Sequence, residues 1–284
     1  GTATAGLVSC GRNRGPNSLI TDTEEYNGTS WTEVTNAPTG LESGGSVGTQ
    51  TAMLMVGGYS SEYLPQTYNY DGTNWTSGPD FPSAIGEESS SGTQTNALIY
   101  GYTNDSTMVA NTASYDGSSF TEVADLSTAR SSGSSGKAGG DTSASGLLAA
   151  GTSPGAPYTT NSEEWTIPST TFTKKIEGQL YFNSTSNAFK VTEKNVPGGT
   201  WASAPSLNNS RNLPYGTGTK TAAIAVGGYT TPPSTSRGYT EIWDGSSWTE
   251  GNDLNLAASG KGGGGTSTSA VFGAGYSTIP GASP

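Results

Sequence analysis

The chain has 284 residues, of which 31% are apolar and 12% charged, and its formal net charge is −11. This charge argues against nucleic acid and anionic membrane surfaces as partners, because both need clustered Lys and Arg, and the sequence has no apolar run long enough for membrane insertion. The single cysteine allows no internal disulfide, and the lack of histidine removes most zinc, copper and haem sites, so we expect no metal and no cofactor.

Low hydrophobicity with a high net charge is typical of disordered chains. However, the six Trp, fourteen Tyr and six Phe recur at regular intervals, which favours an ordered fold with small cores. The chain opens without a methionine or a signal peptide, which fits a mature product or a fragment of a longer protein.

A repeat of about 45 residues starts at the first residue and runs through most of the chain. Each copy has Gly-Thr-x-Thr, a short apolar run, and then an aromatic residue followed by Asn-Gly or Asp-Gly and by Trp or Phe. The opening motif starts at Gly1, Gly48, Gly92 and Gly218, and the aromatic before the turn is Tyr26, Tyr70, Tyr115 or Trp243. Tyr26 and Tyr70 are 44 residues apart, and Tyr70 and Tyr115 are 45 apart, so the period is nearly constant.

Each copy converts directly into strands. The apolar run at 52–56 is short and bounded by glycine, which predicts a buried strand. The Asp-Gly or Asn-Gly dipeptide predicts a hairpin turn in which both turn residues take positive φ. Small residues at 43–46 and 131–135 suit an inner strand near a crowded axis. Four strands per copy predict a propeller blade, and no window has the apolar period of a helix.

The fourth copy breaks the period, because the next clean unit begins only at about Asn212. The excess at 177–200 contains two apolar stretches around a Ser-Thr-Ser-Asn turn, and Thr200-Trp201 then restores the usual outer strand. We interpret this excess as an inserted β-hairpin, with a compact extra blade as the alternative.

Six inner strands can be counted, and the last, at 270–276, has no aromatic hairpin before Pro284. An open edge strand invites pairing with another chain. Either the ring closes by unusual strand sharing, or the missing strands come from a neighbour or a removed segment. We therefore expect residues 1–284 to form a single all-β propeller domain with six blades favoured, seven as the alternative, and the hairpin in the fourth repeat.

The inner strand, Gly-Gly, Tyr-Asp-Gly and Trp pattern resembles kelch repeats over almost the whole chain. The arginine-containing inner strand of the kelch consensus is faint here, at Ala129-Arg130 and Ser210-Arg211. Kelch-type propellers include copper oxidases, but their metal site needs His as well as Tyr, and this chain has no His.

Several residue patterns could carry chemistry, and most are better explained by structure. The pairs Glu24-Glu25, Glu87-Glu88 and Glu163-Glu164 could indicate glycoside hydrolysis. Adjacent strand residues face opposite sides, so we interpret them as solvated strand residues. The Asp-Gly turns are interpreted as turns rather than calcium sites. The tryptophans of the repeat are interpreted as packing between blades: Trp31, Trp75, Trp201 and Trp248.

Aromatic residues outside the repeat slots are the better candidates for contact with a ligand or partner, because binding residues concentrate on loops held by a rigid scaffold. The loop candidates are Tyr63, Tyr102, Tyr158 and Tyr215. The inserted hairpin adds Tyr181 and Phe182. No catalytic residue is predicted, and we expect that the protein is not an enzyme.

The stretches Gly178 to Asn183, Phe189 to Val191 and Thr200 to Ser203 resemble segments of structural proteins of marine bacteriophages, as do Gly-Thr-Gln-Thr-Ala and Tyr-Asp-Gly-Thr/Ser-x-Trp. The resemblance implies a virion protein, such as a tail fibre, receptor-binding or decoration component. Its partners would be other virion subunits or host surface glycans, and a homo-oligomer is compatible with it. The alternative is a secreted or cell-surface bacterial module that binds carbohydrate or protein.

Overall fold

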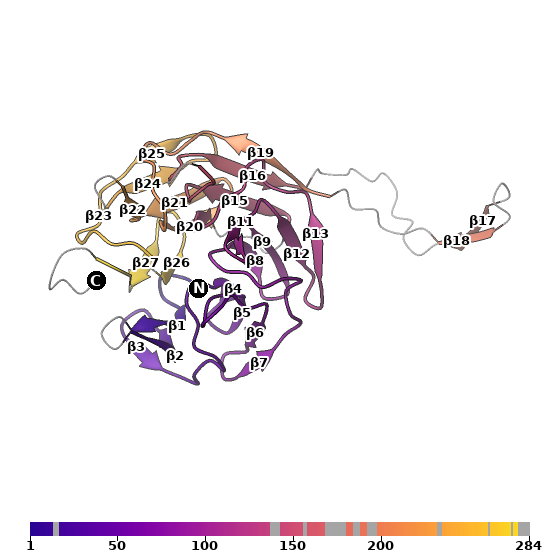
Figure 1. Ribbon diagram of the computed structural model, residues 1–284, viewed down its shortest axis with the longest axis horizontal. Coiled ribbons are helices and arrows are strands. Elements are labelled where there is room, and N and C mark those ends of the chain that lie inside the picture. Colours follow the sequence, from indigo (N-terminus) through magenta and orange to yellow (C-terminus); the bar gives the residue numbers. More distant parts are fainter. Residues whose placement is uncertain are drawn as a thin grey trace.

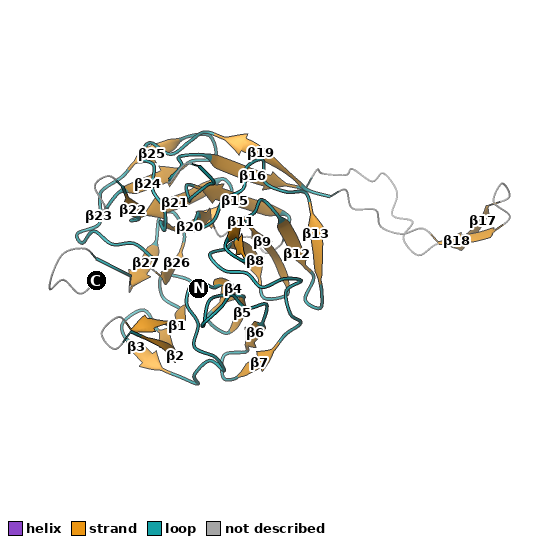
Figure 2. Ribbon diagram, viewed as in Figure 1, coloured by secondary structure: helices purple, strands orange, loops and turns teal. Residues whose placement is uncertain are grey.

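The computed structural model describes residues 1–13, 17–136, 143–155, 158–167, 180–183, 188–191, 198–231, 235–260, 262–273 and 275–277. Every regular element in these ranges is a β-strand, and the sheets stand side by side around a common centre (Figure 1; Figure 2). The described part of the chain is an all-β propeller, as the repeat predicts.

Five antiparallel sheets of three or four strands form the blades, which we letter A to E in chain order. Blade A has three strands, β1 (Gly6–Asn13), β2 (Ser18–Tyr26) and β3 (Trp31–Glu33). Blade B has β4 (Gly45–Thr49), β5 (Ala52–Val56), β6 (Thr67–Tyr70) and β7 (Trp75–Ser77). Blade C has β8 (Ser89–Thr93), β9 (Asn96–Tyr100), β12 (Thr112–Tyr115) and β13 (Phe120–Val123).

The remaining two blades follow the same order from the centre outward. Blade D has β14 (Ser134–Gly136), β15 (Ser145–Ala149), β16 (Ser162–Thr166) and β19 (Thr200–Ala204). Blade E has β20 (Tyr215–Thr219), β21 (Ala222–Val226), β24 (Thr240–Trp243) and β25 (Trp248–Glu250). Each complete blade therefore has the four strands that one copy of the repeat predicts.

The last repeat forms only a two-stranded sheet of β26 (Gly262–Gly265) and β27 (Ala270–Gly273). This pair stands between blade E and blade A, with β26 in contact with β20 and with β1 (Figure 1). The expectation of six blades, or seven, is corrected to five, because the last repeat contributes no third or fourth strand within the described ranges. Gly1 lies beside β26 and β4, and its amino group donates a hydrogen bond to the Gly48 carbonyl (3.1 Å).

The hairpin at the Asp-Gly positions differs from the predicted turn. Tyr70 pairs with Trp75, so four residues connect β6 to β7, and among them only Gly72 has a positive φ (93°). The Asp71 carboxylate accepts hydrogen bonds from the backbone N–H groups of Thr73 (2.8 Å) and Asn74 (2.7 Å). The prediction that both turn residues take positive φ is wrong, because the aspartate closes the loop with its side chain while the glycine alone supplies the left-handed backbone.

The Gly-Thr-x-Thr motif forms the tight turn between the inner and second strands. Gly48 has φ of 113°, and a Cβ there would lie 2.0 Å from the Ala52 carbonyl oxygen. Gly92 and Gly218 take the same conformation in blades C and E. The motif recurs because this position admits no side chain.

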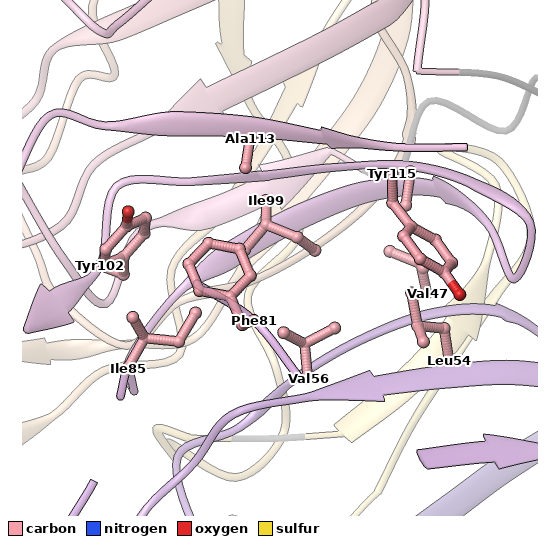
Figure 3. Close-up of a cluster of buried hydrophobic side chains, with 10 residues drawn as sticks. Val47, Leu54, Val56, Phe81, Ile85, Ile99, Tyr102, Ala113 and Tyr115 are labelled. Carbon is pink, nitrogen blue, oxygen red and sulfur yellow. The ribbon is translucent and has the colours of Figure 1, made fainter. Parts of the chain in front are cut away.

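The hydrophobic core lies between neighbouring sheets. Figure 3 shows one cluster, in which Leu54 and Val56 of blade B face Ile99 and Tyr115 of blade C, and Phe81 lies among Ile99, Tyr102 and Val56. The inner strands carry mostly Gly, Ser and Thr, as predicted for strands that converge on an axis. No stretch of the described residues forms a helix with the length and hydropathy to span a membrane.

Two buried ion pairs join the third strands of blades D and E to the connecting segments. Arg130 pairs with Glu163, and Arg211 Nη1 lies 2.5 Å from Glu241 Oε1, with all four side chains almost completely buried. The interpretation of Glu163 as a solvated strand residue is wrong, because it is the counterion of a buried arginine. Glu164, its neighbour, points the other way and lies 3.7 Å from the Lys220 ammonium group.

Three further two-stranded sheets lie in the connections between strands. They are β10 (Thr103–Asn104) with β11 (Thr107–Met108), β22 (Tyr229–Thr230) with β23 (Thr235–Ser236), and β17 (Leu180–Asn183) with β18 (Ala188–Val191). The last of these is the predicted hairpin, and Figure 1 shows it apart from the ring. It is inserted between β16 and β19, the third and outer strands of blade D.

Candidate ligand-binding face

The connections between the second and third strands of each blade emerge on one side of the ring, because antiparallel strands of the same order place them there. In three units a tyrosine follows the glycine turn and forms a backbone bridge to the segment ahead of an inner strand: Tyr59 to Glu42, Tyr229 to Asn212 and Tyr276 to Ser259. We call this side the tyrosine face and define it by its partly exposed members, Tyr59, Tyr63, Tyr158, Tyr229 and Tyr276.

A relay of backbone hydrogen bonds supports this face and joins the units to one another. The N–H of Glu87 donates to Ser43 O (2.7 Å), and the N–H of Ser132 donates to Glu87 O (2.8 Å). The N–H of Leu213 donates to Ser132 O (3.0 Å), and that of Gly260 donates to Leu213 O (3.1 Å). All five residues have positive φ, between 49° and 60°. These backbone hydrogen bonds link each unit to the next, and together they support the loops of the face.

Tyr59 and Tyr63 form the first aromatic cluster of the face. Their rings meet edge to face with centroids 5.5 Å apart. Tyr63 also covers Gly86, where a Cβ would lie 2.6 Å from the Tyr63 ring. Burial, with a smaller contribution from the charge of Glu87, raises the pKa of Tyr63. The hydroxyl is therefore neutral over the physiological range and can donate as well as accept.

A second cluster lies across blades D and E. The pKa of Tyr158 is raised by partial burial and by its neighbour Tyr229. Tyr239 lies beneath two guanidinium groups, with Arg237 Cζ 5.7 Å and Arg211 Cζ 6.0 Å from its ring centroid. The Arg237 Nε donates to Thr230 Oγ1 (2.8 Å). Aromatic rings and a partly exposed arginine are thus placed together on the same face.

Glu87 and Glu88 lie in the segment that precedes β8 and differ in environment, so the interpretation of this pair as solvated strand residues is wrong. Glu87 Oε2 accepts from Thr103 Oγ1 and from Ser131 Oγ, both at 2.9 Å. Glu88 turns inward, where its Oε1 accepts from the Gly45 N–H and its Oε2 is buried without a hydrogen-bond partner among the described residues. Burial raises the pKa of Glu88 to about 8, with a minor contribution from the charge of Glu87.

The sequence candidates fall in different surroundings. Tyr63 and Tyr158 lie on the tyrosine face. Tyr102 lies in a loop but is only 6% exposed, because it packs edge to face on Phe81 (5.5 Å). Tyr215 lies in β20 rather than in a loop, so the interpretation of it as a loop residue is wrong: its hydroxyl donates to the Gly263 carbonyl and its ring packs on Phe272.

Tyr181 and Phe182 lie in β17, but their side chains fall outside the described residues. A role for any of the six candidates in ligand contact stays a prediction. Residues missed at the sequence level are Tyr59, Tyr229 and Tyr276. The signal for them was the Gly-Gly-Tyr element of the repeat, which we assigned to the scaffold because it recurs.

The described structure includes two small cavities near residues of interest. One, of about 190 Å³, is lined by Tyr102, Phe81 and Val109 together with Asn111 and Glu122, whose side chains are hydrogen-bonded to each other (2.9 Å). The other, of about 170 Å³, lies over the Arg130–Glu163 pair and has mostly polar walls. Tyr102 is the one sequence candidate that lines either of them.

Comparison with known proteins supports the β-propeller fold and does not indicate a function. No family model matches the sequence, and no curated protein matches it. The solved structure of YjhT, a propeller, is similar with a TM-score of 0.67 at 11% sequence identity, over 91% of this chain and 85% of that chain. At this identity the similarity shows a β-propeller and carries no activity, since one fold serves many functions.

Proposed function

We propose that this chain is a non-enzymatic binding component of a virion, of the tail fibre, receptor-binding or decoration type, and that its tyrosine face contacts host surface glycans. The single observation that carries the binding part is the presence of partly exposed tyrosines, from several units, on one rigid face. Tyrosine offers a large amphipathic surface at low cost in conformational entropy, with a polar tip for hydrogen bonds. The sequence resemblance to marine phage structural proteins supports the virion part.

The electrostatics favour an uncharged or weakly charged ligand. The net charge of −11 repels polyanions over the distances at which partners meet. Two acidic groups near the first cluster are already engaged, Glu42 with Arg12 (2.6 Å) and Glu87 with two hydroxyl groups. The exposed Glu62 next to Tyr63 adds a negative charge, so the cluster offers tyrosine hydroxyls and an acceptor, which suits a neutral polysaccharide.

The test is binding of the full chain to polysaccharide extracted from the host envelope and to an array of neutral glycans. The double variant Tyr59→Ala/Tyr63→Ala and the variant Tyr229→Ala should each lose about tenfold or more in affinity, the range of an aromatic hot spot. Ile242→Ala is the matched control, because Ile242 is a large exposed side chain (39%) on strand β24 and not on the tyrosine face.

Binding that the face variants leave unchanged would overturn the role of this face. Release of shortened glycans from the polysaccharide would overturn the non-enzymatic part. Mass spectrometry of purified particles tests the virion part. Glycan binding by a chain that is absent from particles would favour a secreted or cell-surface module instead.

A further inference from the structure

At two boundaries, C–D and D–E, the tryptophan of one blade binds the third strand of the preceding blade. The indole N–H of Trp201 in blade D donates to Thr112 Oγ1, the first residue of the third strand of blade C (3.0 Å). The indole N–H of Trp248 in blade E donates to Ser162 Oγ in the same position of blade D (3.2 Å). A hydroxyl at the start of one third strand therefore binds the tryptophan of the next blade.

A glutamine in the inner hairpin makes the second contact. Gln94 Nε2 of blade C donates to the carbonyls of Met53 (3.0 Å) and Tyr70 (2.8 Å), at the beginning of the second strand and the end of the third strand of blade B. Gln50 of blade B donates to Gly6 and Tyr26 of blade A in the same way. The glutamine contact repeats at the A–B and B–C boundaries, and the tryptophan–hydroxyl contact at the C–D and D–E boundaries, whereas Trp75 at the A–B boundary donates to Thr35 O.

We call the boundary between β27 and blade A the seam. Blade A provides its tryptophan there, but the preceding unit provides no third strand among the described residues. β27 pairs with β26 along one edge and with no other strand among the described residues. Trp31 holds the position of Trp201 and Trp248 but is 37% exposed, against 8% for Trp248. Its ring reaches β27, because a Cβ on Gly273 would lie 3.8 Å from it. An unpaired strand edge and an exposed tryptophan therefore lie next to each other.

The complete blades define what fits there. The strand next to the outer strand of each blade (β2, β6, β12, β16 and β24) has one pattern, a hydroxyl residue with Tyr or Trp three positions later: Thr23–Tyr26, Thr67–Tyr70, Thr112–Tyr115, Ser162–Trp165 and Thr240–Trp243. In blade B, Thr67 pairs with Val56 and Tyr70 with Met53. By the same alignment a strand on β27 would place its hydroxyl residue opposite Gly273, beside Trp31, and its aromatic residue opposite Ala270.

We propose that the seam is an acceptor site for one extended segment of another polypeptide that carries the pattern Ser/Thr-x-x-Tyr/Trp. The segment adds antiparallel to β27 as a third strand, by the strand addition used in many peptide-recognition domains. Its Ser or Thr hydroxyl accepts a hydrogen bond from Trp31 Nε1, as Thr112 and Ser162 accept at the intact boundaries. The choice of this occupant rests on the continuity of the blade interface around the ring and not on the tyrosine face.

The experiment uses the full chain and a fluorescently labelled peptide with the sequence of residues 66–72, the third strand of blade B and its turn. Fluorescence anisotropy should show saturable binding. A peptide with Thr67→Val should bind about threefold to tenfold more weakly, because the indole N–H loses its acceptor. A peptide with proline at both Tyr68 and Asn69 should not bind, because proline removes the N–H donors of the strand ladder.

Protein variants locate the site. Trp31→Phe keeps a ring but loses the N–H, so it should weaken binding of the Thr67 peptide and abolish the difference between the Thr67 and Val peptides. Trp75→Phe removes the same group at the intact boundary of blades A and B, where Trp75 Nε1 donates to Thr35 O (3.0 Å), and should leave peptide binding unchanged. No saturable binding up to about 1 mM peptide, equal binding of the proline peptide, or equal effects of the two tryptophan variants would each overturn the proposal.

Discussion

Glu88 provides a direct test of how tightly the inner strands of blades B and C pack. Its Oε1 accepts from the Gly45 N–H, and Gly45 leaves the room for it, since a Cβ there would lie 2.7 Å from Glu88 Cγ. Glu88 as a whole is half-buried, but its Oε2 is buried without a hydrogen-bond partner among the described residues. Burial raises the pKa of this carboxyl from 4.5 to about 8, so the native protein holds a proton that the unfolded chain releases.

The sign and size of the effect on stability follow from proton linkage. Below pH 4.5 both states bind the proton and Glu88 has no effect. Between pH 4.5 and 8 the native state binds more protons than the unfolded state, so the free energy of unfolding falls by about 1.4 kcal/mol per pH unit. The total loss is at most roughly 5 kcal/mol, a large part of the stability of a typical domain.

The perturbation is Glu88→Gln, which keeps the acceptor for the Gly45 N–H and removes the titration. Denaturant unfolding gives the free energy of unfolding of wild type and variant at pH 5, 6, 7 and 8. The value for the variant minus that for the wild type should rise at each step, even if the amide lowers the stability at pH 5. Glu87→Gln is the control: it removes only the minor contribution of the neighbouring charge, so most of the slope should remain. A wild-type minus Glu88→Gln difference that is constant from pH 5 to 8 would refute a buried, protonated Glu88.

Three further outcomes are expected. Arg211→Leu should lower the free energy of unfolding by about 3–5 kcal/mol because it leaves Glu241 buried and unpaired; adding Glu241→Tyr should recover part of this loss in denaturant unfolding. Gln94→Glu should destabilise the fold by about 1–3 kcal/mol, more than Gln94→Ala, because it places an acceptor against two carbonyl oxygens. Hydrogen bonds from Ser246 and Ser247 lower the pKa of Asp244 to about 2, so Asp244→Ala should lower the melting temperature at pH 7. That difference should shrink as the pH falls from 3.8 through 2, and a difference that persists at pH 2 would contradict it.

Strand order was predictable from the sequence because each strand of the repeat has its own chemical signature. The apolar run, the aromatic before the turn and the Trp-Thr start of the outer strand recur at nearly constant spacing, and all three are strands in the structure. The turn was predictable only in part. Asp-Gly indicates a two-residue hairpin, but the aromatic pair Tyr70–Trp75 fixes the register at four intervening residues, so the distance between paired aromatics was the better guide.

Buried charge was not predictable because its partners are distant in sequence. Glu163 resembles any acidic residue of an exposed strand, and its counterion Arg130 lies 33 positions away in a connecting segment. Blade B shows the alternative use of the same positions. There Leu41 and Tyr68 belong to one apolar cluster, and Leu41 precedes the bridge residue Glu42 as Arg211 precedes Asn212. The repeat keeps the backbone positions, while blades D and E fill this buried space with an ion pair and blade B with an apolar pair.

The number of blades was not predictable from the sequence. The repeat gives the number of units, but the number of complete blades depends on the contacts between neighbouring units. Trp31 and Trp248 occupy the same position of the repeat, yet Trp31 is 37% exposed and Trp248 is 8% exposed. The difference comes from the neighbour: Ser162 of blade D provides an acceptor for Trp248, whereas the β26–β27 pair provides no third strand for Trp31 within the described residues. The sequence position therefore determines which surface a residue presents, and the adjacent unit determines whether that surface is scaffold or a site for a partner.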